Sequence, residues 1–238
     1  MERENEIFRA KLDEVAERFD EMVDSMKKVC MMDGDLTREE RNRLVLAYKK
    51  SVESRRKSWR IIHYTVQKME ERDQTEHLQA TKDYRQKVEA EIENICNDCC
   101  HLIDLYILPQ APDAEAIVFF TKMKGDYYRY LAEIKVGDER QNIANQCRQA
   151  YEQASATASA ELESTHATRL GVALNHAIFY NEIEDNVEKA LELAQYAFDQ
   201  AIEEVDNLDG AEYEDSTYLL ELLSNNINLW TPKPANGW

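Results

Sequence analysis

The sequence predicts an all-α fold, a nine-helix antiparallel bundle. The 238 residues include only six Gly and four Pro, so long stretches contain no residue that breaks a helix. Apolar residues recur with the 3.6-residue period of a helix along almost the whole chain, and no extended segment shows the two-residue period of a strand. The loops between the expected helices are short, which makes consecutive helices antiparallel neighbours.

The first half of the chain is expected to hold four helices. Thr37 and Glu40 form a capping box, in which each side chain satisfies a backbone donor at the start of a long helix. The apolar residues that follow lie on one stripe of that helix. Pro109 ends the fourth helix, because proline cannot continue the backbone hydrogen bonding. The expected elements are two short helices separated near 18–20, then helices over about 36–69 and 74–108.

Five further helices are expected in the second half. Gly137 is predicted to end the helix over about 114–136, and Asp138 to cap the next one. Asp209-Gly210 marks a loop before the last helix. The final three helices are expected from about 168, from about 187 and over about 215–230. Residues 232–238, with two prolines, predict a flexible tail after one helical domain over 1–231.

Charge and cysteine content exclude several classes of protein. The net charge of −18 argues against general nucleic-acid binding and against docking on anionic membranes, since both need a basic surface. Five cysteines in a chain this long predict no disulfide framework and a reducing compartment. The first residues are charged, unlike a signal peptide, and no run of 18 apolar residues predicts a membrane span. We expect a cytoplasmic protein that is also compatible with the nucleus.

Two patterns resemble metal sites but lack the necessary ligands. Cys96, Cys99 and Cys100 share one helical face, and zinc requires ligands from a second element that the chain does not offer. Core packing is the more typical role for such thiols. Glu163-x-x-His166 is a single copy of a pattern that di-iron bundles use twice. No phosphate loop or nucleophile motif is present, so we expect no metal, no cofactor and no enzymatic activity.

Basic residues at helical spacing suggest an anion site. Lys49 and Arg56 lie seven residues apart, as do Lys122 and Arg129, so each pair shares one helical face. Arg suits phosphate because its planar fork holds two oxygens at once. Solvated faces with local partners explain the same spacing. The spacing alone leaves both interpretations open, because it does not show that the two stripes meet.

Long sequence motifs resemble the 14-3-3 family from about residue 4 to residue 231. The most specific is Lys-Met-Lys-Gly-Asp-Tyr-Tyr-Arg-Tyr-Leu-Ala-Glu over 122–133. It is accompanied by Arg-Arg-Lys-Ser-Trp-Arg over 55–60, Arg-Leu-Gly-Val-Ala-Leu-Asn over 169–175 and Asn-Ile-Asn-Leu-Trp over 226–230. The resemblance implies a non-enzymatic adaptor that dimerises into a cup. Its amphipathic grooves would bind phosphoserine or phosphothreonine motifs of client proteins and so regulate their activity, location or assembly.

The resemblance also implies roles for individual residues. Lys49, Arg56, Arg129 and Tyr130 would hold the phosphate. Asn175 and Asn226 would bind the ligand backbone through their amides. Lys122 and Glu182 match polar groove positions, and Trp230 matches a closing tryptophan. The apolar wall would be Leu174, Ile178, Leu219, Leu222 and Leu229, for which a plain core role stays open.

Further residues match the dimer interface of the family. Leu12 and Ala16 would contact the partner's Tyr84 and Val88 region. Ion pairs would join Arg18 to Glu91 and Glu21 to Lys87 across the interface. Ser58 follows a basic kinase motif, and we hypothesise that its phosphorylation loosens the dimer. A homodimer is expected, or a heterodimer with related chains.

Three positions depart from the family pattern, and one alternative function remains. Asp13 replaces a small apolar residue at the dimer seam, whereas His176 and Asn225 stand beside the groove residues Asn175 and Asn226. The first bears on dimer strength and the others on ligand preference. The alternative function is a helical scaffold that binds its partners without phosphate.

Overall fold

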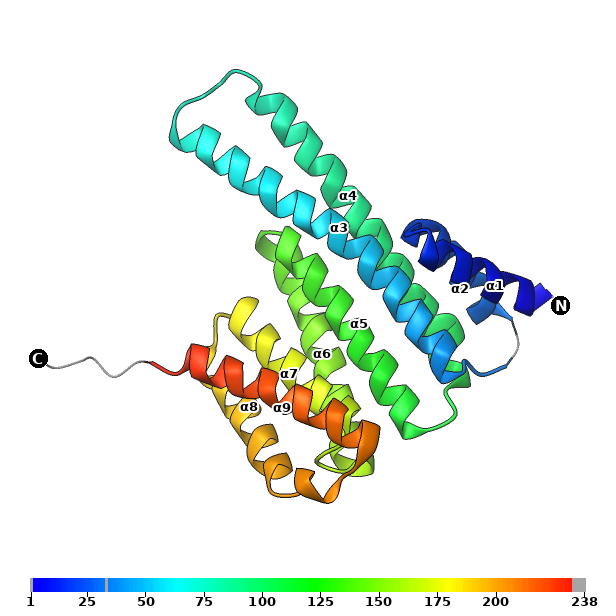
Figure 1. The fold of residues 1–238 in the computed structure, drawn as a ribbon. Coiled ribbons are helices and arrows are strands. Elements are labelled where there is room, and N and C mark those ends of the chain that lie inside the picture. Colours follow the sequence, from blue (N-terminus) through cyan, green and yellow to red (C-terminus); the bar gives the residue numbers. More distant parts are fainter. Residues whose placement is uncertain (1, 33, 233–238) are drawn as a thin grey trace, which may run out of the picture. The chain divides into compact units, whose positions relative to one another are not determined.

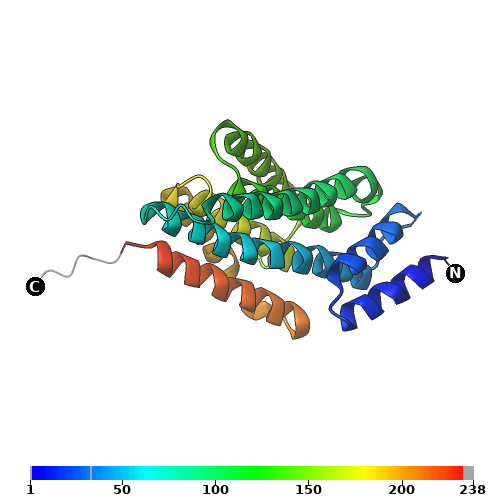
Figure 2. The same cartoon turned by 90° about the horizontal axis from the view of Figure 1, so that it is seen from above.

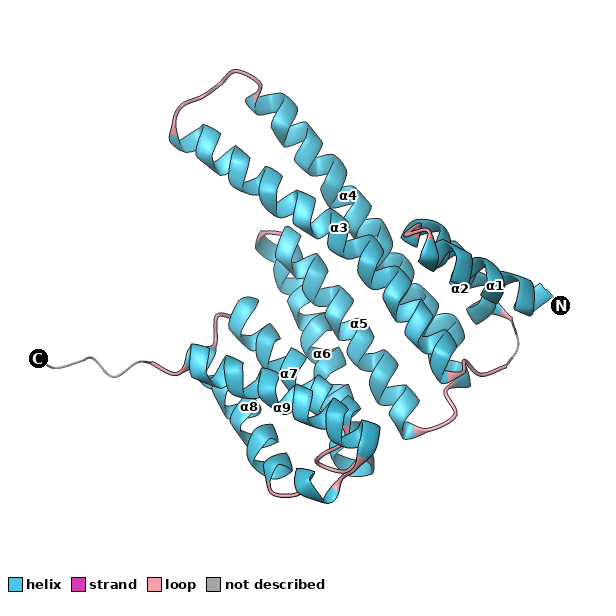
Figure 3. Ribbon diagram, viewed as in Figure 1, coloured by secondary structure: helices cyan, strands magenta, loops and turns pink. Residues whose placement is uncertain are grey.

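The computed structural model describes residues 2–32 and 34–232. Within these ranges it contains nine α-helices and no strand (Figure 3), which confirms the predicted fold class. The chain divides into two compact units, Met1–Gln110 and Ala111–Trp238. The single helical domain over 1–231 stays a prediction. Apart from Pro232, the predicted tail lies outside the described residues.

The first unit consists of a short helical hairpin beside a long one (Figures 1 and 2). α3 has 34 residues, which at 1.5 Å per residue is about 51 Å. The predicted capping box is present at its start: the Glu40 backbone N–H donates to Thr37 Oγ1 at 3.3 Å, and the Thr37 N–H donates to Glu40 Oε2 at 2.8 Å. The elements are α1 (Glu2–Val15), α2 (Phe19–Met31), α3 (Arg38–Glu71) and α4 (Leu78–Leu102), followed by a π-helical turn (Ile103–Ile107) and a 3-10 turn (Leu108–Gln110).

The fourth helix differs from its predicted range at both ends. Asp73 and His77 have positive φ values of 51° and 62°, so the chain turns there and α4 begins at Leu78. After Leu102 the backbone widens into the π-helical turn, and Pro109 lies in the 3-10 turn. The cysteines of this unit are buried, namely Cys30, Cys96, Cys99 and Cys100. No cluster of three or more potential metal ligands occurs among the described residues.

The second unit is a five-helix bundle. α5 packs on α6, α7 packs on α8, and α9 lies against both α7 and α8 (Figure 1). Alanines on α7 and α8 allow a close approach around a core that includes Leu170, Leu220 and Leu223. The helices are α5 (Ala114–Ile134), α6 (Gly137–Glu161), α7 (Ala167–Glu182), α8 (Val187–Ile202) and α9 (Gly210–Trp230), with a 3-10 turn at Val205–Asn207.

Two glycines of this unit begin helices instead of ending them or lying in a loop. Gly137 and Gly210 are the first residues of α6 and α9, with φ values of 58° and 53°. Such positive φ values cost glycine little, because it has no Cβ. Asp138 therefore lies in the first turn of α6 and not at its cap, and α9 begins five residues earlier than predicted. No described helix is both long enough and apolar enough to cross a membrane.

Candidate functional site

The first unit presents Lys49 and Arg56 on α3. Lys49 is exposed and Arg56 is half-buried. The adjacent Arg55 serves a different purpose: its Nη1 and Nη2 donate to Asp20 at 2.9 and 2.7 Å, and its Nε donates to Glu91 at 3.3 Å. Arg55 thus joins α2, α3 and α4 within the unit. Of the predicted phosphate ligands, the unit contributes Lys49 and Arg56.

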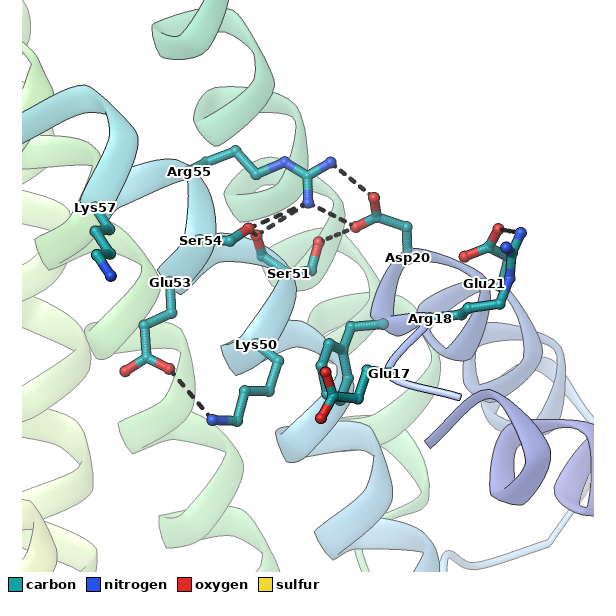
Figure 4. A pocket seen from close by; sticks show the side chains of 11 residues that line it. Glu17, Arg18, Asp20, Glu21, Lys50, Ser51, Glu53, Ser54, Arg55 and Lys57 are labelled. Carbon is teal, nitrogen blue, oxygen red and sulfur yellow. Dashed lines mark hydrogen bonds and ion pairs between the residues drawn. The ribbon is translucent and has the colours of Figure 1, made fainter. Parts of the chain in front are cut away.

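A hollow of about 720 Å³ lies beside Arg55, between the start of α2 and the middle of α3 (Figure 4). Acidic and basic side chains alternate around it, and several of them pair with each other, such as Lys50 with Glu53 at 4.0 Å and Arg18 with Glu21. A hollow of mixed charge has no preference for an anion. It is therefore a poor candidate for a phosphate site.

The second unit places three predicted ligands around one buried carboxylate, that of Asp126. Its Oδ2 accepts from Lys122 Nζ at 2.8 Å. Its Oδ1 accepts from Asn175 Nδ2 at 2.7 Å and from Tyr151 Oη at 2.5 Å. Arg129 Nη2 lies 3.7 Å from the same oxygen. One side chain of α5 therefore organises groups from α5, α6 and α7.

The protonation state of Asp126 determines the direction of its hydrogen bonds with Asn175 and Tyr151, since either residue can donate or accept. Burial by itself raises the pKa of Asp126, but the charges of Lys122 and Arg129 and the hydrogen bonds from Lys122 and Tyr151 lower it below the ordinary value. An ionised carboxylate accepts only. Asn175 must therefore turn its NH₂ toward Asp126, which leaves its Oδ1 as an acceptor without a partner among the described residues.

Arg129 is held from several sides. The residue is only 9% exposed. Its Nε donates to Tyr151 Oη at 3.3 Å, and its Nη1 donates to Glu182 Oε2 at 3.4 Å. Its guanidinium carbon lies 5.1 Å from the centroid of the Tyr130 ring, a cation–π distance. The guanidinium is therefore oriented before any ligand arrives.

The predicted apolar wall is partly core. Leu174 is 7% exposed and belongs to the core of the second unit, whereas Leu229 is 77% exposed. The other three wall residues, Ile178, Leu219 and Leu222, are half-buried and pack against that core, as does the closing tryptophan, Trp230. Asn226 is half-buried on α9. The core role is therefore present on α7 and α9, and the wall role stays a prediction.

His176 and Asn225, the neighbours of the predicted groove residues Asn175 and Asn226, differ in burial. The side chain of His176 is buried against α6, where its Nδ1 lies 3.1 Å from Ser155 Oγ. Asn175, its neighbour, instead bonds to Asp126 on α5. The two side chains thus point to different helices. Asn225 is exposed.

The predicted dimer residues are partly exposed in the single chain. Leu12 and Tyr84 are 54% and 55% exposed, whereas Val88 is 5% exposed. Glu91 accepts from Arg55 within the chain. Ala16, Lys87 and Ser58 are exposed, and Arg18 pairs with Glu21.

Asp13, which departs from the family pattern at the predicted dimer interface, has a hydrogen-bond partner within the chain. Ser25 on α2 donates its hydroxyl to Asp13 Oδ2 at 3.2 Å. This hydrogen bond joins α1 to α2 inside the chain, so the Asp13 side chain has a structural partner of its own.

Sequence reasoning missed Asp126 and Tyr151. Asp126 lies four residues after Lys122 and three before Arg129, a spacing that brings opposite charges together on a helix. That signal could have identified it. Tyr151 carries no such signal, because its partners lie 22 and 25 residues away.

Comparison with known proteins gives consistent matches over nearly the whole chain. A family model described as 14-3-3 protein matches residues 9–231. The chain is 51% identical to 14-3-3-like protein C of Glycine max, covering 99% of this chain and 92% of that protein. It is 50% identical to 14-3-3 protein 9 of Solanum lycopersicum, covering 97% and 88%. It is 48% identical to the checkpoint signal transducer rad24 of Schizosaccharomyces pombe, covering 96% and 85%.

Proposed function

Since this chain belongs to the 14-3-3 family, we propose that Lys49, Arg56, Arg129 and Tyr130 form its phosphate-binding site. The protein is a dimeric, non-enzymatic adaptor. It binds phosphoserine and phosphothreonine motifs of client proteins in an amphipathic groove and regulates their activity, location or assembly.

The observation that carries the site proposal is the fixed orientation of Arg129. A phosphate carries a charge near −2 and three acceptor oxygens, and a guanidinium that is already oriented loses less entropy on binding it. Glu182, which is exposed and 3.4 Å from Arg129 Nη1, is the partner that an incoming phosphate would displace. A neutral serine offers neither the charge nor the acceptors, so it would not displace Glu182.

Asn175 and Lys122 would bind the backbone of the ligand next to the phosphate. Because Asp126 takes the Asn175 NH₂ group, the amide oxygen is left to accept an N–H from the ligand backbone. Lys122 Nζ, bound to Asp126 at 2.8 Å, keeps further donors for a ligand carbonyl. Asn226 and Trp230 would contact the same segment from α9. The apolar wall would be lined by Leu174, Ile178, Leu219, Leu222 and Leu229.

For the dimer, we propose contacts between Leu12 or Ala16 and the partner subunit's Tyr84 and Val88. The pairs Arg18 with Glu91 and Glu21 with Lys87 would require the intrachain pairs Arg18–Glu21 and Arg55–Glu91 to open or to be shared. Exposed ion pairs contribute little energy. They would therefore set the choice of partner more than the strength of the dimer. The proposed locations are the cytoplasm and the nucleus.

Fluorescence anisotropy with matched peptides tests this function. We expect a peptide of the type Arg-x-x-phosphoserine-x-Pro to bind, and the same peptide with plain serine to bind far more weakly. Replacing Arg56 and Arg129 together by Ala removes at least two charge-assisted hydrogen bonds, each worth about 1.5–3 kcal/mol. The double variant should therefore lose more than about 100-fold in affinity.

A control variant distinguishes the loss of the proposed site residues from a general loss of positive charge. Arg9→Ala with Arg72→Ala removes the same two positive charges from exposed positions outside the proposed site and should change affinity by less than about threefold, since exposed charges are screened by salt. Equal binding of both peptides by the wild-type protein would instead favour the alternative, a scaffold that ignores phosphate. Equal losses in the two double variants would refute the assignment of Arg56 and Arg129.

A further inference from the structure

The second unit holds a cavity of about 130 Å³ between α6, α7 and α8. None of the residues proposed to bind phosphate or peptide lines it. The three helices face it with residues at helical spacing, and many of these side chains are small, among them Ser155, Ala158, Ala173 and Ala197. Small side chains where three helices meet leave space that larger residues would fill.

The cavity has a buried floor and an exposed rim. Leu170, Val172 and Ala158 are buried, whereas Tyr196 and Gln200 at the rim are exposed. A ligand can therefore enter from solvent with its apolar part first. An engineered apolar cavity of about 150 Å³ holds one benzene molecule, so this cavity has room for a single six-membered ring.

Arg169 supplies the charged group of the lining. It is half-buried, and its Nη1 donates to the Leu162 carbonyl oxygen at 2.8 Å. It forms no ion pair with any carboxylate of the described residues, although the chain carries 47 acidic side chains. Its remaining N–H groups can bind a carboxylate. Glu204 is an acidic group near the cavity: it accepts from the lining residue Ser164 at 3.3 Å and is exposed.

The other lining side chains carry no charge near neutral pH, because the histidine among them is neutral. The His176 ring stacks on Tyr151 and Tyr180 at centroid distances of 5.4 and 5.1 Å. Burial lowers the pKa of His176 to about 4, so the ring is neutral at pH 7. Its Nε2 is buried and has no hydrogen-bond partner in the described part of the chain. The positive charge therefore comes from Arg169 alone among the lining side chains.

From these observations we propose that the cavity binds a small aromatic carboxylic acid of the size of benzoate. The ring would lie among Leu170, Val172 and Leu193, and the carboxylate would bind Arg169. This site is independent of the proposed phosphopeptide groove. The protein would accordingly carry a second ligand site, for a metabolite-sized anion, on a different set of helix faces.

Ligand-observed NMR with sodium benzoate and with neutral benzyl alcohol tests the proposal on the full chain. Benzoate should bind in the millimolar range and about fivefold more tightly than benzyl alcohol, because charge-assisted hydrogen bonds are roughly twice as strong as neutral ones. Arg169→Gln should remove that preference. Glu204→Gln should tighten benzoate slightly, because it removes a repelling charge.

A cavity-filling variant locates the binding. Ala197→Leu places three more carbon atoms in the lining and should weaken both probes about tenfold, since the added atoms occupy the space that the ring would fill. Its matched control is Ala160→Leu, at an exposed position of α6 outside the cavity, which should bind like the wild type. The proposal is refuted if neither probe binds, if Ala197→Leu leaves binding unchanged, or if benzyl alcohol binds as tightly as benzoate. Displacement of benzoate by a saturating phosphopeptide would also refute it, because that result would place benzoate in the groove.

Discussion

Replacing Gly125 by Ala tests the link between packing and the phosphate site. A Cβ on Gly125 would lie 2.9 Å from both Cδ1 and Cε1 of the Tyr151 ring, and 3.1 Å from its Cζ. Ordinary contact begins near 3.4 Å, so the ring must move by about 0.5 Å (3.4 minus 2.9). Tyr151 is fully buried, and His176 and Phe179 pack around its ring. The ring therefore cannot move without disturbing its neighbours.

Two destabilising contributions and one stabilising contribution determine the expected loss of stability. Overpacking a core costs about 1–3 kcal/mol. A weakened hydrogen bond from Tyr151 to the ionised Asp126, now 2.5 Å, costs about 1 kcal/mol more, a part of the full value of such a bond. Ala gains about 1 kcal/mol over Gly in a helix interior. The free energy of unfolding of Gly125→Ala should therefore fall by about 2 kcal/mol.

Urea denaturation and peptide anisotropy measure the two consequences. Because Tyr151 Oη accepts from Arg129 at 3.3 Å, a displaced ring should also weaken phosphopeptide binding, by roughly three- to tenfold, the equivalent of one hydrogen bond.

Gly171→Ala is the matched control. Its Cβ would lie 3.5 Å from Lys122 Cε, an ordinary contact with the end of a flexible chain. This variant should gain about 0.5–1 kcal/mol. If Gly125→Ala gains as much stability as Gly171→Ala and binds peptide normally, the reasoning about Tyr151 is wrong.

Three further predictions concern a helix cap, the pH dependence and the dimer. Thr37→Ala should lower the free energy of unfolding by about 1 kcal/mol in urea denaturation, because it removes the acceptor for the Glu40 N–H; an unchanged midpoint would count against the capping box. Burial lowers the pKa of His176 from 6.5 to about 4, so between these pH values the unfolded state binds more protons than the folded state. The free energy of unfolding should therefore fall as the pH is lowered from 6.5 to 4, by up to about 3 kcal/mol. The variant His176→Phe should lose less stability than the wild type between pH 6.5 and 4, and parallel curves would contradict this. Ser58→Glu places charge at an exposed residue of the proposed interface and should shift sedimentation toward monomer; sedimentation wholly as dimer would exclude the phosphorylation hypothesis.

The amino-acid sequence determined the helices and most of their ends. The capping box at Thr37 and Glu40 was predictable because it joins residues three apart, and the apolar period was predictable because it depends only on residues within the same helix. The exceptions are equally local in origin. Gly137 and Gly210 were expected to end a helix and to lie in a loop, but their positive φ values let them begin α6 and α9. Glycine allows either role, and the sequence alone does not choose between them.

For the binding site, the sequence motifs supplied the residue types and their resemblance to a family, but not their surroundings. Spacing placed Lys122 and Arg129 on one face of a helix. The same spacing places Asp126 beside both. Only the tertiary structure joins that carboxylate to Tyr151 and Asn175, because these partners lie 25 and 49 positions away. The same holds for Leu174, which is mostly core, and for His176, which faces α6. Periodicity shows which side chains share a helix face. Which neighbour each face meets depends on how the helices pack, and that packing fixes the direction of the hydrogen bonds that orient Arg129 and Asn175.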